Sequence, residues 1–161
     1  MSEMKIRNQK IGTGHPVYII AEIGINHNGS IEEAFKLIDL AKETGCDAVK
    51  FQKRTPEIAV PESQWDEPKQ TPWGRMNYID YKKRMEFDIN QYKEIDLYCK
   101  KNNITWFASC WDEVAVEEMA SINIECFKVA SATLTDQVTI NKMLSYDCLL
   151  YTSDAADEVL G

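Results

Sequence analysis

Residues 17–51 read VYIIAEIGINHNGSIEEAFKLIDLAKETGCDAVKF and contain two apolar runs separated by one amphipathic segment. The first run, residues 17–24, is almost continuously apolar, which is typical of a strand buried on both faces. Ser30 opens a capping box and predicts the start of a helix, and Gly45 predicts its end. The second run, residues 48–51, predicts another strand. The stretch therefore predicts a strand, a helix and a strand in that order.

Two further pairs of strands and helices follow a long polar segment. This segment carries four prolines and is too long for a plain connector, and long loops in compact domains are usually functional or disordered. Beyond it, Asp88 opens a second capping box and predicts a helix that ends near residue 102. The remaining expected elements are a strand at 104–108, a helix at 112–121, a strand at 126–130 and a helix at 136–144.

The alternation of strands and helices predicts a parallel sheet with right-handed crossovers and outer helices. A closed eight-stranded barrel needs about 250 residues, whereas the chain has 161. A doubly wound sheet would carry a G-x-G-x-x-G turn after its first strand, and Gly24 and Gly29 lack that spacing. The sequence therefore predicts an α/β chain that forms the N-terminal half of a (β/α)8 barrel. We expect open strand edges at residues 17–20 and 126–130, and hence aggregation or dependence on a partner.

Composition and charge narrow the class of protein. A chain with 44% hydrophobic and 27% charged residues is typical of a globular domain rather than a disordered or low-complexity one. The net charge of −8 disfavours a general nucleic-acid interface. No run approaches the roughly 20 apolar residues of a membrane span. Five scattered cysteines without a C-x-x-C pair favour free thiols, so we expect a cytoplasmic protein.

Charged residues interrupt three of the expected apolar strands. Glu22, Lys50 and Lys128 fall where side chains should be buried, and a buried charge is costly without a partner or a ligand. Two inward lysines with Ser131 nearby would form an anion site, to which the N-terminus of the next helix would add donors. Alternatively, Glu22 forms a structural salt bridge with one of the lysines. The spacing leaves both interpretations open.

Other polar residues near the strand ends are weaker candidates. Asn26 and His27 follow the first strand, and Gln52 follows Lys50 by two positions. A single histidine without a companion is more often a hydrogen-bonding group in a loop than a metal ligand. The basic and aromatic residues at 78–84 form either a lid over the substrate or a solvated face.

Three motifs occur in order along the chain: AEIGINHNG at residues 21–29, DAVKFQ at 47–52 and FKVAS at 127–131. Together they resemble the N-acetylneuraminate (sialic acid) synthase family, and the resemblance is collinear from about residue 19 to residue 144. Three ordered motifs are far more specific than any one of them.

The resemblance implies a (β/α)8 synthase with a small C-terminal antifreeze-protein-like domain, usually a homodimer. Such enzymes condense phosphoenolpyruvate with an N-acetylated hexosamine, typically N-acetylmannosamine, to give a nonulosonic acid and phosphate with the help of a divalent metal, manganese or magnesium. Carried over by motif, Glu22 is implied to be catalytic, and the residues implied to bind substrate are Lys50, Lys128, Ser131, Asn26, His27 and Gln52. The family's metal-binding histidines lie in later strands, so no metal ligand is expected in this chain.

The chain also departs from the family pattern. Thr133 stands where some members carry an acidic residue, which leaves the sugar open. Residues 149–161, LLYTSDAADEVLG, differ from the fifth strand and Ser-Thr-Gly-like turn of the family. We therefore expect a partial barrel domain at residues 1–148 and an atypical tail at 149–161, either foreign to the family or a divergent strand start.

Two other interpretations of function stay open. The first is an aldolase or lyase on the same barrel, in which Lys50 or Lys128 forms a Schiff base. The second is a non-catalytic half-barrel. Because the metal ligands of the family lie outside it, we expect the chain to be inactive by itself.

Overall fold

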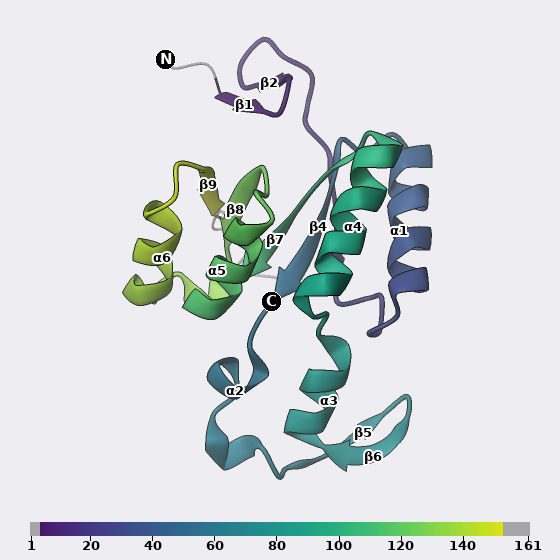
Figure 1. Cartoon of the computed structure of the whole chain (residues 1–161), viewed down its shortest axis with the longest axis vertical. Coiled ribbons are helices and arrows are strands. Elements are labelled where there is room, and N and C mark those ends of the chain that lie inside the picture. Colours follow the sequence, from purple (N-terminus) through teal and green to yellow (C-terminus); the bar gives the residue numbers. More distant parts are fainter. Residues whose placement is uncertain (1–3, 153–161) are drawn as a thin grey trace.

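The structure, a computed structural model, describes residues 4–152 and is built on one parallel sheet (Figure 1). Its strands are neighbours in chain order, and every neighbouring pair is parallel. They are β3 (Ile20–Gly24), β4 (Ala48–Lys53), β7 (Thr105–Cys110), β8 (Cys126–Val129) and β9 (Leu149–Thr152). A parallel sheet that grows in one direction through helical crossovers is the arrangement of a (β/α)8 barrel. The predicted fold class, the N-terminal part of such a barrel, is confirmed.

Four helices cover the outer face of this sheet. They are α1 (Ile31–Glu43), α4 (Ile89–Asn102), α5 (Glu113–Ser121) and α6 (Gln137–Leu144). Alternate strand residues, including Val49, Phe51, Trp106 and Phe127, pack with buried residues of the helices in one hydrophobic core. Most of the large apolar side chains of the strands therefore lie on the helix side, and Phe107 is an exception on the inner face.

The N-terminal caps predicted at Ser30 and Asp88 are present, but Ser30 does not form the expected capping box, because the Glu33 carboxylate binds Lys36 instead. The Ser30 hydroxyl accepts a hydrogen bond from the N–H of Glu33 at 3.2 Å, and Asp88 takes part in a complete capping box. Asp112 and Asp136 cap α5 and α6. Each cap contributes about 1 kcal/mol. The starts of the four outer helices are thus fixed by local sequence.

A small hairpin lies across the N-terminal end of the sheet's inner face (top of Figure 1). It is formed by β1 (Met4–Ile6) and β2 (Gln9–Ile11). Ile6 of this hairpin packs with Ala48, Phe107 and Cys126, all of which are fully buried. The N-terminal end of the inner face is therefore an apolar layer closed by the hairpin.

The long polar segment folds into an insertion at the opposite, C-terminal end of the sheet (bottom of Figure 1). Its elements are α2 (Pro56–Ala59), the 3-10 turn η1 (Glu62–Gln64), β5 (Pro68–Thr71), β6 (Gly74–Asn77) and α3 (Tyr78–Met85). The Thr71 hydroxyl donates to the carbonyl of Gly74 at 2.7 Å, and the Trp65 indole donates to the carbonyl of Val60 at 2.9 Å. The insertion is ordered by its own hydrogen bonds.

Of the two expected open edges, the first strand is an edge of the described sheet, whereas residues 126–130 are not. Strand β3 begins at Ile20, opposite Ala48, and is therefore shorter at its start than expected. Ile19 still bonds the chain at the start of β4, since its carbonyl accepts from the N–H groups of Asp47 at 2.8 Å and Ala48 at 3.2 Å. Val17 is 82% exposed. The expectation of an open edge at residues 126–130 is wrong, since β9 pairs with β8. The edges of the described sheet are β3 and β9.

Strand β9 lies within the segment predicted to be an atypical tail. Its residues pair in parallel with β8 in the register Cys126↔Leu149 to Val129↔Thr152. The rest of that segment, residues 153–161, lies outside the described residues. The division of the chain at residue 148 stays a prediction.

Candidate anion-binding site

The carboxyl ends of β4, β7 and β8 surround a pocket of about 460 Å³. Gln52, Ser109 and Lys128 stand opposite one another in these neighbouring strands, so their side chains share the inner face. The lining consists of Lys50, Gln52, Ser109, Trp111, Lys128, Ala130, Ser131 and Ala132. The sheet thus brings four predicted site residues into one pocket.

The charged side chains of this pocket are Lys50 and Lys128, which are only 5% and 6% exposed. Removing an ammonium group from water is costly unless a carboxylate or an anionic ligand replaces the lost hydration. The two lysines belong to β4 and β8, with only β7 between them. They concentrate positive charge locally in a chain whose net charge is −8. The pocket therefore favours an anion.

Glu22 lies beside the pocket on strand β3. Its Oε1 is 2.7 Å from Nζ of Lys50, its register partner in β4. The side chain of Glu22 is 60% exposed, so the expectation that this carboxylate is buried is wrong. The reason is topological, because β3 is an edge of the described sheet. The salt bridge and the anion pocket, expected as alternatives, share Lys50.

Fewer main-chain N–H groups are free to donate hydrogen bonds near Ser131 than the sequence analysis expected. Ser131 opens the 3-10 turn η2 (Ser131–Thr133) and lines the pocket. At the start of α6, however, the carboxylate of Asp136 accepts from the N–H groups of Val138 at 3.0 Å and Thr139 at 3.3 Å. The expectation that this helix N-terminus adds donors to the anion site is wrong, because its own cap occupies them.

His27 lies in the loop after β3 and is 1% exposed. Its ring stacks on Phe87 at a centroid distance of 3.9 Å, and its Nδ1 accepts from the N–H of Gly29 at 3.1 Å. Burial lowers the pKa of His27 to about 4, so the ring is neutral at pH 7. Asn26 is exposed and shares a separate hollow of about 270 Å³ with Glu22. Neither Asn26 nor His27 lines the lysine pocket.

Ser109 and Trp111 also line the pocket but were not among the predicted site residues; Trp111 stood out in the sequence only as a tryptophan in a loop at the carboxyl ends of the strands. Ser109 is 3% exposed and lies in the row with Gln52 and Lys128. Its position at the end of an apolar strand was the only signal in the sequence. Gln52 is held by a main-chain contact, because its carbonyl accepts from the Tyr92 hydroxyl at 2.7 Å.

A second group of buried charges lies next to the pocket, where β4 and β7 end. Lys53 Nζ is 2.9 Å from a carboxylate oxygen of Glu118 and donates to the carbonyl of Phe87 at 3.0 Å. The carboxylate of Asp112 accepts from the N–H of Thr55 at 2.6 Å and from its hydroxyl at 2.9 Å. The contacts of Asp112 tie the ends of β4 and β7 together, and those of Lys53 tie β4 to α5 and to the residue before the α4 cap.

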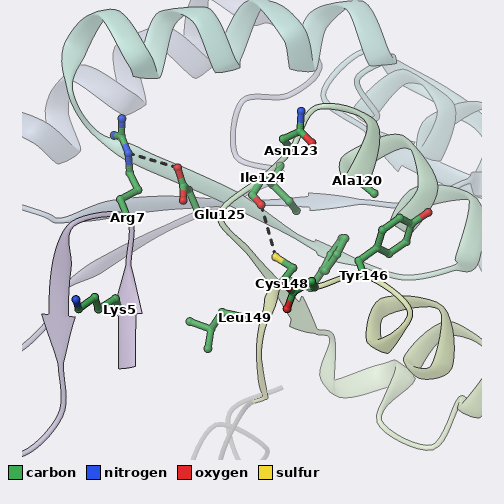
Figure 2. A pocket seen from close by; sticks show the side chains of 11 residues that line it. Lys5, Arg7, Ala120, Asn123, Ile124, Glu125, Tyr146, Cys148 and Leu149 are labelled. Atoms are coloured by element: carbon green, nitrogen blue, oxygen red, sulfur yellow. Dashed lines mark hydrogen bonds and ion pairs between the residues drawn. The ribbon is translucent and has the colours of Figure 1, made fainter. Parts of the chain in front are cut away.

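Another pocket, of about 520 Å³, lies at the N-terminal end of the sheet beside the β1–β2 hairpin (Figure 2). Arg7 forms an ion pair with Glu125 at 3.4 Å across it, and the Cys148 thiol donates to the carbonyl of Ile124 at 3.5 Å. These groups are paired with one another. In parallel barrels the chemistry gathers at the carboxyl ends of strands, so we take the lysine pocket as the candidate site.

Residues 4–152 contain no group of three or more His, Cys, Asp or Glu side chains that could hold a metal ion. No helix among them combines the length and the apolar character that a membrane span requires.

Comparison with known proteins identifies the family. The family model described as NeuB family matches residues 37–154, more than half of the chain. The chain belongs to the NeuB family. Among curated proteins, this NeuB-family chain is 41% identical over 123 residues to the N-acetylneuraminate-9-phosphate synthase of Mus musculus, a match that covers 75% of the chain and 34% of the mouse protein.

Two other relatives extend this comparison. The N,N'-diacetyllegionaminic acid synthase of Campylobacter jejuni is 31% identical over 127 residues, covering 78% of the chain and 38% of that protein. The crystal structure of N-acetylneuraminic acid synthetase from Leptospira borgpetersenii has a TM-score of 0.82 at 24% identity and covers 99% of the chain and 53% of that protein, which shows the shared fold. The chain spans about a third of the length of the curated relatives it matches.

Proposed function

We propose that the complete protein carrying this chain condenses phosphoenolpyruvate with an N-acetylated hexosamine, N-acetylmannosamine or a relative, to give a nonulosonic acid and phosphate. The observation that carries this proposal is the pocket with two buried lysines at the strand ends. Phosphoenolpyruvate carries a phosphate and a carboxylate, and two ammonium groups in one pocket match two anionic groups. Membership of the NeuB family and similarity to synthases of N-acetylneuraminate 9-phosphate and diacetyllegionaminic acid support this class of reaction.

In this proposal Lys50, Lys128 and Ser131 bind phosphoenolpyruvate. The two ammonium groups neutralise its anionic groups, and the serine hydroxyl donates a hydrogen bond to one of their oxygens. Gln52 lies in the same row as Lys128 and orients the bound substrate through its amide. These four groups stand on strand ends or directly after them, so the sheet fixes their mutual geometry before the ligand arrives.

Glu22 is proposed as the catalytic carboxylate. Its contact with Lys50 places an acceptor next to the bound phosphoenolpyruvate. From there the carboxylate accepts a proton from the sugar or from the attacking water. The exposure of Glu22 gives the sugar access to it.

The bonds change in two stages. C3 of the enol ester attacks the aldehyde carbon of the open-chain sugar, and the aldehyde oxygen takes up a proton as the carbon–carbon bond forms. Water adds at C2, and the bond from C2 to the phosphate oxygen then breaks so that phosphate leaves. The pocket contributes by presenting C3 to the sugar and by stabilising the negative charge of the departing phosphate through Lys50 and Lys128.

Further parts of the proposal concern groups outside the pocket. Asn26 and His27 shape the loop next to Glu22, and the neutral, stacked ring of His27 acts as its support. The divalent metal implied by the resemblance, manganese or magnesium, is proposed to be held by residues outside this chain. We infer from the same resemblance that the complete protein is a homodimer, and from its unpaired cysteines that it works in the cytoplasm.

The alternative of a Schiff-base aldolase is disfavoured by one contact. Lys50 is engaged as an ammonium group in the ion pair with Glu22, and formation of a Schiff base would break that pair. Borohydride trapping with a carbonyl substrate tests this alternative directly. A stable adduct on Lys50 or Lys128 would replace the synthase proposal.

The decisive experiment is to recover the complete reading frame across the segment near residue 148 and to assay its product. We expect phosphate release that requires phosphoenolpyruvate, N-acetylmannosamine or a related hexosamine, and manganese. We also expect the 161-residue chain to be inactive by itself. If the complete protein ignores phosphoenolpyruvate, the synthase proposal fails, and Glu22, Lys50 and Lys128 form only an ion network.

A further inference from the structure

Arg54, the residue after β4, is a buried cation that contacts the wall of the lysine pocket. Its guanidinium carbon lies 5.1 Å from the centre of the Trp111 ring, and Trp111 lines the pocket. Its Nε donates to the carboxylate of Glu86. The side chains of Arg54 and Glu86 are only 5% and 7% exposed. A buried guanidinium is therefore held between a carboxylate and an indole.

Glu86 links this contact to the insertion. It is the C-terminal cap of α3, the last helix of the insertion, and its carboxylate also accepts from the main-chain N–H of Arg54 at 3.3 Å. Burial raises the pKa of the Glu86 carboxyl, and Arg54 opposes that shift. Each of the two charges is thus compensated by the other, and the orientation of the guanidinium depends on Glu86.

The main chain at Trp111 is already fixed by other contacts. Its N–H donates to the carbonyl of Lys53 at 3.0 Å, and the adjacent Asp112 binds Thr55. The remaining freedom of Trp111 is the rotation of its side chain. No residue in the described part of the chain accepts a hydrogen bond from its indole N–H, so the ring is not anchored at that end. The stacked guanidinium is the contact that fixes the ring plane.

From these contacts we propose that Arg54 is a positioning residue that holds the indole of Trp111 as an apolar wall of the lysine pocket, with Glu86 fixing Arg54 in turn. The inference rests on the proposed function for the identity of the ligand, but the contact itself does not depend on it. Trp111 belongs to the pocket together with Ala130 and Ala132, so the pocket has an apolar part beside its lysines.

If Trp111 forms an apolar wall, the pocket should bind phosphoenolpyruvate and inorganic phosphate through different sets of contacts. Inorganic phosphate uses the lysines and the serine hydroxyl alone. Phosphoenolpyruvate has, in addition, an enol carbon skeleton that needs an apolar surface. Loss of the stacked guanidinium should therefore weaken the binding of phosphoenolpyruvate and leave the binding of phosphate unchanged. General unfolding or loss of the lysines would weaken both.

The test uses the complete protein and measures the dissociation constants of phosphoenolpyruvate and inorganic phosphate by calorimetry. The variant is Arg54→Met. Because it leaves the Glu86 charge buried without a partner, a second variant, Arg54→Met with Glu86→Gln, removes both charges and protects the fold. The matched control is Lys83→Met, which breaks the exposed ion pair of Lys83 with Glu57 in the same insertion. Trp111 emission, obtained as the difference from Trp111→Phe, reports the position of the ring.

We expect both Arg54 variants to raise the dissociation constant of phosphoenolpyruvate about tenfold, to leave that of phosphate unchanged, and to shift Trp111 emission to longer wavelength. The control should change none of the three. Equal weakening for both anions, or unchanged Trp111 emission, would overturn the inference. If the unsubstituted protein binds phosphate but not phosphoenolpyruvate, the proposed function fails, and the emission shift still decides whether Arg54 positions Trp111.

Discussion

The two ends of the sheet's inner face use the same strands for different purposes. At the N-terminal end, Phe107 of β7 and Cys126 of β8 are fully buried beneath the β1–β2 hairpin. Two residues further along the same strands, Ser109 and Lys128 line the pocket. The apolar end stabilises the sheet, whereas the polar end buries ammonium groups at a cost in stability. Because the apolar end and the polar end are separate along the strands, a substitution in the pocket should leave the apolar packing that stabilises the fold in place.

The sharpest test of this comparison replaces one residue at each end of β7. Phe107→Ala removes a fully buried ring that also meets Tyr151 edge-on at 5.8 Å, and it should lower the free energy of unfolding by about 4 kcal/mol. Ser109→Ala, on the same face two residues later, should lower it by no more than about 1 kcal/mol. Urea unfolding measures both. Similar losses at the two positions would show that the ends do not differ in their contribution to stability.

His27 gives a second test of the difference between the two ends of the sheet. It follows β3, at the pocket end, but its ring is buried and stacks on Phe87 like a core residue. Its pKa in the folded chain, about 4, lies below the ordinary 6.5, so the folded state binds fewer protons between these values. Stability is therefore fully present above pH 6.5 and falls by about 3 kcal/mol as the pH drops through 6.5 to 4. Urea midpoints between pH 8 and pH 4 measure the loss.

The variant His27→Phe keeps a ring stacked on Phe87 and removes the titrating group. It should abolish this part of the pH dependence, although its stability at pH 8 also falls because Gly29 loses an acceptor. The matched control is His15→Phe at an exposed position, which should keep the pH dependence of the unsubstituted chain. An unchanged pH dependence in His27→Phe would contradict the assignment of a buried neutral ring.

Local pattern was enough to predict most of the sheet and half of the site. Ser30 and Asp88 cap helices where the sequence predicts them, because a cap depends only on the next three residues. Lys50 and Lys128 were found because a charge inside an apolar strand is conspicuous, and the period of two places both on the inner face. These signals need no knowledge of tertiary structure.

The missed features depend on contacts between distant segments. The exposure of Glu22 follows from the position of β3 at the sheet edge, which no local pattern encodes. Arg54 meets Glu86 across 32 positions, and the stacking of Arg54 on Trp111 needs the ends of β4 and β7 to be side by side. Sequence reasoning therefore found the lysines of the pocket but not what supports its wall.

Lys50→Met tests the polar end of the comparison by itself. The substitution removes one of the two ammonium groups and should raise the dissociation constant of phosphoenolpyruvate about a hundredfold. Its effect on unfolding should stay within about 1 kcal/mol, because Glu22 remains hydrated at 60% exposure. Lys36→Met, which breaks an exposed pair with Glu33, is the control of equal charge and should leave binding unchanged. Equal binding by Lys50→Met and the control would remove Lys50 from the site.

Gly29→Ala tests how the insertion is attached to the pocket end. Gly29 has φ +73°, and a Cβ added there would lie 2.2 Å from the main-chain oxygen of Arg84 in α3. Gly45, at the end of α1, has a similar φ of +83° but nothing within 4 Å of an added Cβ. Both alanine variants carry the strain of a positive φ, so their difference isolates the close approach of the loop to α3.

We expect Gly29→Ala to cost about 2 kcal/mol more than Gly45→Ala in urea unfolding, because backbone cannot move aside as a flexible side chain can. Displacement of α3 should also reach its C-terminal cap, Glu86, and through Arg54 the ring of Trp111. Gly29→Ala should therefore shift Trp111 emission, whereas Gly45→Ala should not. Equal costs with unchanged emission would show that the insertion is not held by this loop, and that the pocket end is built on the strand ends alone.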